Sequence, residues 1–308
     1  MSVDDKNFKL SVDIDEITLR NPTMLASGIL GISQRIFERL YDENIGGIVT
    51  KSISVEPMKG YPNPTIIPLS GGSYLNAVGL SNPGVNAFSE ELSQNKNIPI
   101  FISLVGSSEK DFAKMIKVFD SLNIIGYEIN LSCPHVSKMG MEVGDDLEAV
   151  TKIVSTARKN TKKPISVKVG VGSVDVIELA RTAIDAGANI ITAINTLRAM
   201  SIDVETMMPI LSNRIGGLSG TAIKPIGIRC VYEISKNLKV PVIGCGGIST
   251  WQDVVEYMLA GASAVQIGSV LGSAGPGIFN NITKDLKKYI ERKGIMKISE
   301  IVGIAHKY

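Results

Sequence analysis

The chain has 308 residues, of which 44% are hydrophobic and 20% charged, and its formal net charge is +2. This length is long for an ordinary domain but normal for one α/β barrel, and a core of this size should fold without disulfide or metal crosslinks. The near-neutral charge, with no basic run interleaved with aromatic residues, argues against nucleic-acid binding. The sequence has no apolar run of about 18 residues, so we expect no membrane-spanning helix.

Eight short apolar runs recur along the chain, and a longer segment follows each of them. The runs are rich in β-branched residues and bounded by Gly or Pro, as buried parallel strands are. Three of the intervening segments, 109–122, 173–188 and 250–262, have helical features, and the last two begin at Ser or Thr caps. The pattern predicts an α/β fold, a (β/α)8 TIM barrel, as a single domain over residues 1–308. The predicted strands lie within residues 22–28, 46–52, 99–106, 126–132, 164–170, 188–196, 240–247 and 263–271.

Two connections are too long to be simple loops. One spans residues 53–82 after the second strand, and the other spans 197–221 after the sixth. Both leave the carboxyl ends of strands, which is the face where barrel active sites lie. We expect these insertions to be structured and to take part in binding.

Cysteine and histidine usage limits the chemistry. The three cysteines, Cys133, Cys230 and Cys245, are widely spaced, and there are only two histidines. We therefore expect no disulfide framework, no iron–sulfur cluster within this chain and no metal site. The first ten residues are polar and include two acids, which predicts no signal peptide and a cytoplasmic location.

The predicted strand ends carry glycine and lysine. Glycines after the last two strands, together with the "GGLSG" stretch at 216–220, favour a phosphate site, although tight turns would also use them. Lys51 and Lys168 each end an apolar strand. Such a lysine is suited to forming a Schiff base, to placing positive charge beside a flavin or carboxylate, or only to reaching the rim.

The cysteines differ in their surroundings. Cys133 precedes Pro134, so it lies on an extended loop, and on this ground alone a catalytic role is less frequent than an unremarkable one. Cys230 sits in a helical apolar pattern and is expected in the core. Cys245 interrupts a glycine-rich strand end and is expected to be a small filler.

Eight motifs, spread over nearly the whole chain, resemble the class 1 dihydroorotate dehydrogenases, which are FMN-dependent barrels of pyrimidine synthesis. "NAVGLSNPG" and "GGLSGTAIKP" are specific as a pair, and the others are weaker alone. The motifs are "LASG" (25–28), "TKS" (50–52), "NAVGLSNPG" (76–84), "NLSCP" (130–134), "INT" (194–196), "GGLSGTAIKP" (216–225), "GCGGI" (244–248) and "IGS" (267–269).

The resemblance implies one FMN per chain and oxidation of (S)-dihydroorotate to orotate, with Cys133 as the base that removes the C5 proton and a hydride passing from C6 to flavin N5. It implies FMN contacts at Ala26, Ser27, Lys51, Ser52, Ser103, Asn130, Lys168, Ile194, Gly220, Gly246, Gly247, Gly268 and Ser269. The implied substrate contacts are Lys51, Asn76, Ala77, Val78, Gly79, Leu80, Asn130, Asn195 and Thr196. Ser103 and His135 stand where the family often has Asn.

The segment "GGLSGTAIKPIGIRCVYEI" is more similar to the NAD-linked, class 1B catalytic subunits. That similarity implies a homodimeric core, and a partner subunit that carries FAD and an iron–sulfur cluster and passes electrons to NAD. Three alternatives remain open: a uracil or thymine reductase of the dihydropyrimidine dehydrogenase type, a Schiff-base lyase using Lys51 or Lys168, and an inactive FMN-binding module.

Overall fold

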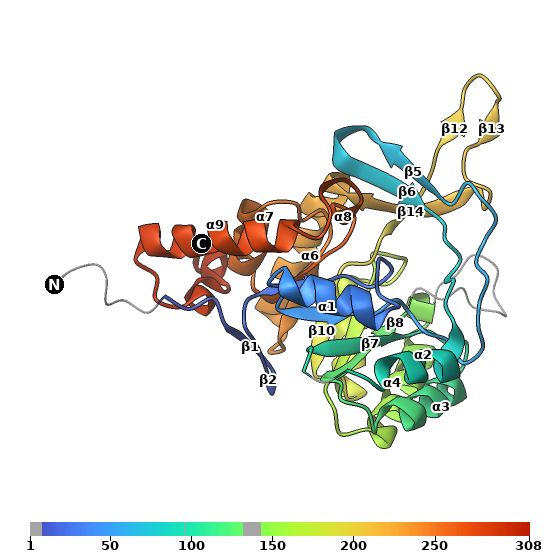
Figure 1. The fold of residues 1–308 in the computed structure, drawn as a ribbon, viewed down its shortest axis with the longest axis horizontal. Coiled ribbons are helices and arrows are strands. Elements are labelled where there is room, and N and C mark those ends of the chain that lie inside the picture. The colour runs from blue at the N-terminus through green and yellow to red at the C-terminus, as the bar shows by residue number, and fades with distance from the viewer. Residues whose placement is uncertain (1–7, 96, 132–142) are drawn as a thin grey trace.

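The computed structural model of the protein describes residues 8–95, 97–131 and 143–308, and eight parallel strands form a closed barrel at its centre (Figure 1). Each barrel strand falls on one of the predicted apolar runs, so the predicted TIM barrel is confirmed. In chain order the strands are β3 (Thr23–Leu25), β4 (Gly47–Val49), β7 (Ile100–Leu104), β8 (Gly126–Asn130), β9 (Ile165–Val169), β10 (Ile190–Ala193), β15 (Val242–Cys245) and β16 (Ala262–Ile267).

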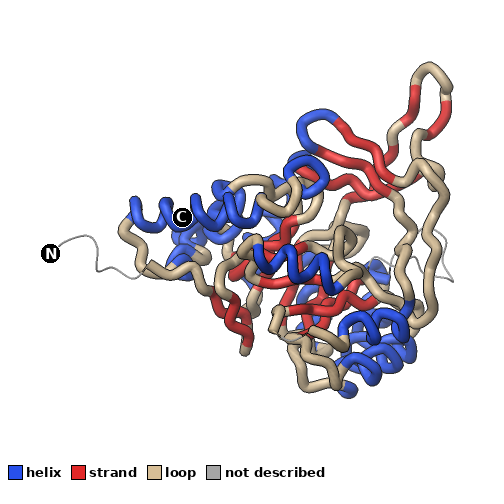
Figure 2. Tube along the Cα trace, viewed as in Figure 1, coloured by secondary structure: helices blue, strands red, loops and turns tan. Residues whose placement is uncertain are grey.

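Helices cover the outside of the barrel (Figure 2). Their bounds are α1 (Gln34–Asp42), α2 (Gly84–Leu92), α3 (Glu109–Phe119), α4 (Leu147–Asn160), α5 (Val176–Asp185), α6 (Lys224–Asn237), α7 (Trp251–Leu259), α8 (Leu271–Ala274) and α9 (Ile278–Lys293). In the described ranges, no helix combines the length and the apolar character needed to cross a bilayer.

The three predicted helices are present as α3, α5 and α7, with one correction to a cap. Thr250 caps α7 as predicted, and its side chain accepts a hydrogen bond from the backbone N–H of Asp253. For α5 the prediction of Ser173 is wrong, because the carboxylate of Asp175 accepts from the N–H groups of Ile177 and Glu178. Ser173 instead donates to Asp145 at 2.6 Å, which joins the loop after β9 to the loop after β8.

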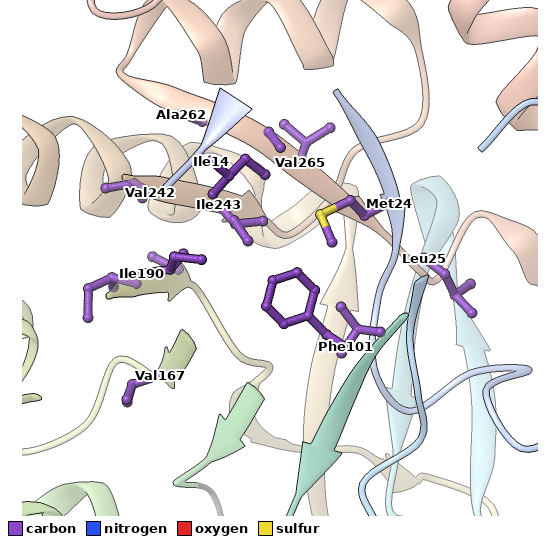
Figure 3. Close-up of a cluster of buried hydrophobic side chains, with 14 of the residues drawn as sticks. Ile14, Met24, Leu25, Phe101, Val167, Ile190, Val242, Ile243, Ala262 and Val265 are labelled. Atoms are coloured by element: carbon purple, nitrogen blue, oxygen red, sulfur yellow. The ribbon is translucent and has the colours of Figure 1, made fainter. Parts of the chain in front are cut away.

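The inside of the barrel has an apolar half around Phe101. Figure 3 shows the Phe101 ring pointing toward Met24 and Ile243. The ring fits because Gly126 on the neighbouring strand has no side chain, and a Cβ there would lie 2.7 Å from the ring. Below this layer the hairpin of β1 (Val12–Ile14) and β2 (Ile17–Leu19), which the sequence pattern did not predict, packs against β16.

Both predicted insertions are structured, and they meet in one sheet. The first contributes β5 (Ile66–Leu69) and β6 (Ser73–Asn76). The second contributes β11 (Leu197–Met200), β14 (Ile215–Gly220) and, between them, the hairpin of β12 (Ile202–Asp203) and β13 (Met208–Pro209), which projects from the body (Figure 1). Strands in the order β11-β14-β6-β5 form a four-stranded antiparallel sheet. Segments some 140 residues apart therefore build one wall beside the barrel.

Lys224, at the start of α6, ties this helix to α7. Its ammonium donates to Asp253 at 2.8 Å and to Glu256 at 3.0 Å. Asp253 also accepts from the backbone N–H groups of Ser249 and Thr250, each at 2.8 Å. Burial alone would raise the pKa of Asp253, but the hydrogen bonds from Lys224, Ser249 and Thr250 lower it below the ordinary 3.8. These contacts of Lys224 and Asp253 hold the loop after β15 in place.

Phe101→Ala should lower the free energy of unfolding by about 3–5 kcal/mol, because the substitution leaves a cavity that the surrounding strands cannot fill. Urea unfolding followed by circular dichroism measures the change. Tyr308→Ala removes a fully exposed aromatic ring and serves as the control, with no measurable effect expected. Equal effects of the two substitutions would contradict the placement of Phe101.

Asp253→Asn should cost about 1.5–3 kcal/mol of unfolding free energy at neutral pH, where the buried carboxylate accepts its hydrogen bonds. A carboxyl whose pKa is lowered by folding stabilises the protein above its unfolded-state pKa, and this stabilisation is lost as the pH falls through the folded pKa. The difference in unfolding free energy between wild type and Asp253→Asn should therefore become smaller below about pH 4. Urea unfolding between pH 3 and 7 measures it.

Asp285→Asn is the matched control for Asp253→Asn. Asp285 pairs with Lys288 at 2.8 Å on the surface, where such a pair contributes little. A gap for Asp253→Asn that stays constant from pH 7 to pH 3 would show that the carboxylate charge does not matter.

Candidate functional site

A cavity of about 1230 Å³ opens where the barrel strands end. Its wall takes residues at or just after the ends of all eight barrel strands, and from the sheet that the two insertions build. This is the face on which TIM-barrel enzymes carry their active sites.

Most of the predicted site residues lie in the wall of this one cavity. The predicted cofactor contacts that line it are Ala26, Ser27, Lys51, Ser52, Asn130, Lys168, Ile194, Gly220, Gly246, Gly247, Gly268 and Ser269. The predicted substrate contacts that line it, besides Lys51 and Asn130, are Asn76, Ala77, Val78, Gly79, Leu80, Asn195 and Thr196.

Two predicted residues stand apart from this set. Ser103 is completely buried and reaches the wall only through its hydroxyl contact with Ser52, at 2.9 Å. The structure thus does not bring Ser103 to the cavity surface, because Ser52 covers it. Cys133 lies outside the described residues, as does His135, and the catalytic role of Cys133 stays a prediction.

One end of the cavity is a wall of bare backbone. Gly220 and Gly247 both adopt positive φ angles, +89° and +70°, which glycine adopts without strain. A Cβ on Gly247 would lie 2.7 Å from the carbonyl oxygen of Gly220, and a Cβ on Gly220 would lie 2.4 Å from that of Gly72. The buried hydroxyl of Tyr257 donates to the Gly246 carbonyl at 2.7 Å and holds this strand end. At these glycines the cavity surface is formed by backbone atoms.

A series of amide and hydroxyl groups crosses the middle of the cavity. Asn195 donates to the side-chain oxygen of Asn130 at 3.2 Å, and Asn130 donates to the Ser52 hydroxyl at 3.0 Å. From the insertion sheet, Asn76 donates to the Gly217 carbonyl at 3.0 Å, which fixes its side chain at the wall. These amides offer both donors and acceptors to a ligand.

The floor of the cavity contains a buried ammonium. Lys168, only 4% exposed, donates to Gln266 at 3.0 Å and to Ser27 at 3.2 Å. The carboxylate of Glu128, 1% exposed, lies with one oxygen 3.9 Å from the Lys168 Nζ. Its other oxygen accepts from Thr192 at 3.1 Å and from Gln266. Four barrel strands, β8, β9, β10 and β16, thus contribute to one polar cluster.

The electrostatics of the lysines differ. Burial on its own lowers the pKa of Lys168, but Cys245 and Glu128 raise it, and the net direction is upward. Lys168 therefore stays charged at neutral pH. For Lys51, which is half-buried, burial lowers the pKa.

Cys245 lines the cavity beside Lys168, so it is not the simple core filler that the sequence pattern suggested. Cys230 is fully buried in the core, as predicted.

Sequence reasoning missed three members of the polar cluster, Glu128, Thr192 and Gln266. The available signal was a polar residue inside an otherwise apolar strand, as in "GYEIN" and "ASAVQI". Such a residue faces the barrel interior and must find a partner there, because an unpaired buried charge is costly.

Together these groups suit a polar, negatively charged ligand. Backbone groups line one end, amide side chains cross the middle, and a fixed positive charge lies at the floor. Lys51, Lys59 and Arg198 add further cations to the wall, against Glu56 and Asp111. Within the described residues, no three His, Cys, Asp or Glu side chains gather as metal ligands would.

Comparison with known proteins identifies the family of the chain. The family described as dihydroorotate dehydrogenase matches residues 9–290. Relatives from three archaea are each named dihydroorotate dehydrogenase B (NAD(+)), catalytic subunit. The Pyrococcus furiosus protein is 42% identical over 301 residues, which cover 97% of this chain and all of the relative. The Methanothermobacter thermautotrophicus protein is 41% identical over 97% of this chain and 99% of its own length.

The third relative, from Archaeoglobus fulgidus, is 42% identical over 96% of this chain and 99% of its own length. The resemblance inferred from the motifs, including the likeness to the NAD-linked catalytic subunits, is therefore confirmed. With a family match over most of its length and relatives at this identity, the chain belongs to the dihydroorotate dehydrogenase family.

Proposed function

We propose that this protein oxidises (S)-dihydroorotate to orotate in the de novo synthesis of UMP, with FMN as its resident hydride acceptor. The observation that carries the proposal is the meeting of the family's cofactor and substrate positions in one cavity, apart from Ser103 and the undescribed Cys133. These positions come from segments spread between residues 26 and 269. Any barrel brings its strand ends together, so the support comes from the residue types that are found there.

The chemistry of the cavity wall fits FMN. The positive-φ glycines Gly220 and Gly247 leave the backbone uncovered where a phosphate needs close N–H donors, and side chains there would collide with neighbouring carbonyls. Lys224 donates to Asp253 and Glu256, so the backbone rather than this ammonium would hold the phosphate. The buried charge of Lys168 suits a flavin ring that gains negative charge on reduction.

The substrate is a small ring with a carboxylate and an alternating N–H and C=O edge. Asn76, Asn130 and Asn195 can match such an edge, since each amide carries both a donor and an acceptor. Lys51, at the cavity wall, supplies positive charge for the carboxylate. The loop from Asn76 to Leu80 would close over the ring from the side of the insertion sheet.

The reaction needs a base and a hydride acceptor on opposite faces of the ring. When bound, FMN would supply the acceptor atom, N5. Cys133 would take the C5 proton, and a thiol, with an ordinary pKa of about 8.5, is suited to this once the site favours its thiolate. Asn130 and Asn195 would orient the ring, and Lys168 would stabilise the negative charge that arrives at the cavity floor.

The electron acceptor follows the names of the relatives, which are catalytic subunits of NAD-linked enzymes. We propose that a homodimer of this chain passes electrons in the cytoplasm to NAD through a partner subunit that carries FAD and an iron–sulfur cluster. Three cysteines in this chain are too few to hold such a cluster, which supports placing it on the partner.

The alternatives have weaker support. A Schiff-base lyase needs an uncharged amine, whereas Glu128 and Cys245 raise the pKa of Lys168. A uracil or thymine reductase would need no positive charge for a carboxylate, yet Lys51 lines the same cavity as the three asparagines. Comparing dihydroorotate with dihydrouracil as the reductant of the bound flavin separates this last alternative.

Gly247→Ala should weaken FMN binding about tenfold or more, because the new Cβ meets the Gly220 carbonyl and displaces the backbone at the phosphate end. Gly294→Ala is the matched control, since Gly294 also has a positive φ but has open space around it. Fluorescence titration of the apoprotein with FMN measures both. Equal affinity of the two variants would argue against a phosphate at this wall.

Cys133→Ser should slow the anaerobic bleaching of the flavin by dihydroorotate about 100-fold or more, because a hydroxyl is a much weaker base than a thiolate. Stopped-flow absorbance measures the rate. Cys230→Ala, in the core and away from the cavity, should bleach at the wild-type rate. Bleaching of Cys133→Ser at the wild-type rate would remove Cys133 from the mechanism, and a wild type that cannot take up FMN would overturn the proposed function.

A further inference from the structure

The buried pair of Lys168 and Glu128 has a geometry that the cofactor and substrate contacts do not explain. Lys168 gives hydrogen bonds to the neutral oxygens of Gln266 and Ser27, not to the carboxylate. The nearer carboxylate oxygen, Oε1 of Glu128, is buried 3.9 Å away and has no hydrogen-bond partner among the described residues. The two side chains therefore interact through charge, with Gln266 as the bridge between them.

Glu128 is held in this place from two sides. Thr192 on β10 and Gln266 on β16 both donate to its other oxygen, Oε2. Thr192 is itself in contact with the hydroxyl of Ser166 on β9 at 2.8 Å. The carboxylate thus sits one layer below the cavity surface, fixed by three strands, and it does not line the cavity itself. A group in this position acts on a ligand through its neighbours that do line the cavity, Lys168 and Gln266, and of these only Lys168 is charged.

Few other groups can balance the ammonium. Among the residues that the structure describes, the charged and titratable side chains that face Lys168 are Glu128 from β8 and Cys245 from β15, and its other polar partners are Gln266 from β16 and Ser27 after β3. Burial raises the pKa of the Cys245 thiol above its ordinary value although Lys168 lowers it, so this thiol adds negative charge beside Lys168 only in the alkaline range where it ionises. Within the described ranges, Glu128 is therefore the counter-charge of Lys168 at neutral pH.

We propose that Glu128 is a positioning residue, which keeps the Lys168 ammonium charged and fixed at the cavity floor so that it can stabilise a ligand that becomes negative on reduction. Without Glu128, burial would favour the neutral amine of Lys168. The positive charge would then be lost at a lower pH than in the wild type. The action of Glu128 on a flavin rests on the proposed function, whereas its pairing with Lys168 does not.

The first test is a stability cycle. Glu128→Gln leaves Lys168 buried without a counter-charge, and it should lower the midpoint of thermal unfolding by about 5–10 °C. The double substitution Glu128→Gln with Lys168→Met removes both charges, and it should recover more than half of that loss. If Glu128→Gln does not fold, folding of the double variant gives the same support. A double variant at least as unstable as Glu128→Gln would show that Glu128 only packs, and would overturn the pairing.

The second test measures the reduction potential of bound FMN between pH 6 and 9. In Glu128→Gln the potential should fall progressively below that of wild type as the pH rises, because Lys168 loses its proton and no longer favours the reduced flavin. When Glu128→Gln is added to Lys168→Met, the reduction potential should show no such pH-dependent fall relative to Lys168→Met alone. Thr192→Val removes a hydrogen bond to Glu128 but no charge, and it is the matched control. Its reduction potential should change with pH in parallel with that of wild type.

The outcomes separate the two proposals. Potentials of Glu128→Gln and wild type that run parallel across the pH range would overturn the role of Glu128 while leaving the flavin enzyme intact. A wild-type protein that takes up no FMN would overturn the proposed function instead. The stability cycle is still readable in that colourless protein, because it needs no ligand.

Discussion

The burial of Lys168 and Glu128 together inside a closed barrel is the constraint on which the rest of the site depends. Each charge alone would cost several kcal/mol to take out of water, so the barrel tolerates them only as a hydrogen-bonded group. That group needs one side chain from each of β8, β9, β10 and β16 in the correct register, because a slip of one residue turns a strand's side chains to the opposite face. Phe101 and its apolar neighbours fill the other half of the barrel and leave the cluster at the mouth.

A second dependence links the mouth of the barrel to the two insertions. β6 and β14 pair as neighbours in the sheet that walls the cavity, with Asn76 opposite Gly217. Asn76 stays at the wall because its amide donates to the Gly217 carbonyl, and Gly217 itself must be small because a Cβ would lie 2.2 Å from the Thr196 hydroxyl. The same sheet carries Gly220, at the other end of β14, next to the glycine wall. One sheet therefore positions a predicted substrate contact and a predicted phosphate contact together.

Features with a local signal could be predicted from the sequence, whereas features built by distant contacts could not. The apolar runs, the Thr250 cap and the two long insertions all leave a pattern within a short window. The pairing of β6 with β14 and the contact between Gln266 and Glu128 join residues about 140 positions apart, and no window contains both partners. The prediction of the α5 cap was wrong for a different reason. Ser173 and Asp175 are both residue types that cap helices well, but the Ser173 hydroxyl donates to Asp145, and Asp175 caps the helix. The motifs of a known family predicted most of the residues that line the cavity. They did not predict that Ser103 is buried behind Ser52, because this depends on how the two strands pack.

The central claim is that one cavity holds a flavin and dihydroorotate at the same time, with Lys168 at its floor. A crystal structure of the protein with FMN and orotate tests this most directly. The account predicts the phosphate against the backbone of Gly220 and Gly247, the flavin ring in contact with Lys168, and orotate among Asn76, Asn130 and Asn195. A flavin or orotate bound elsewhere, or a phosphate away from the glycine wall, would contradict it.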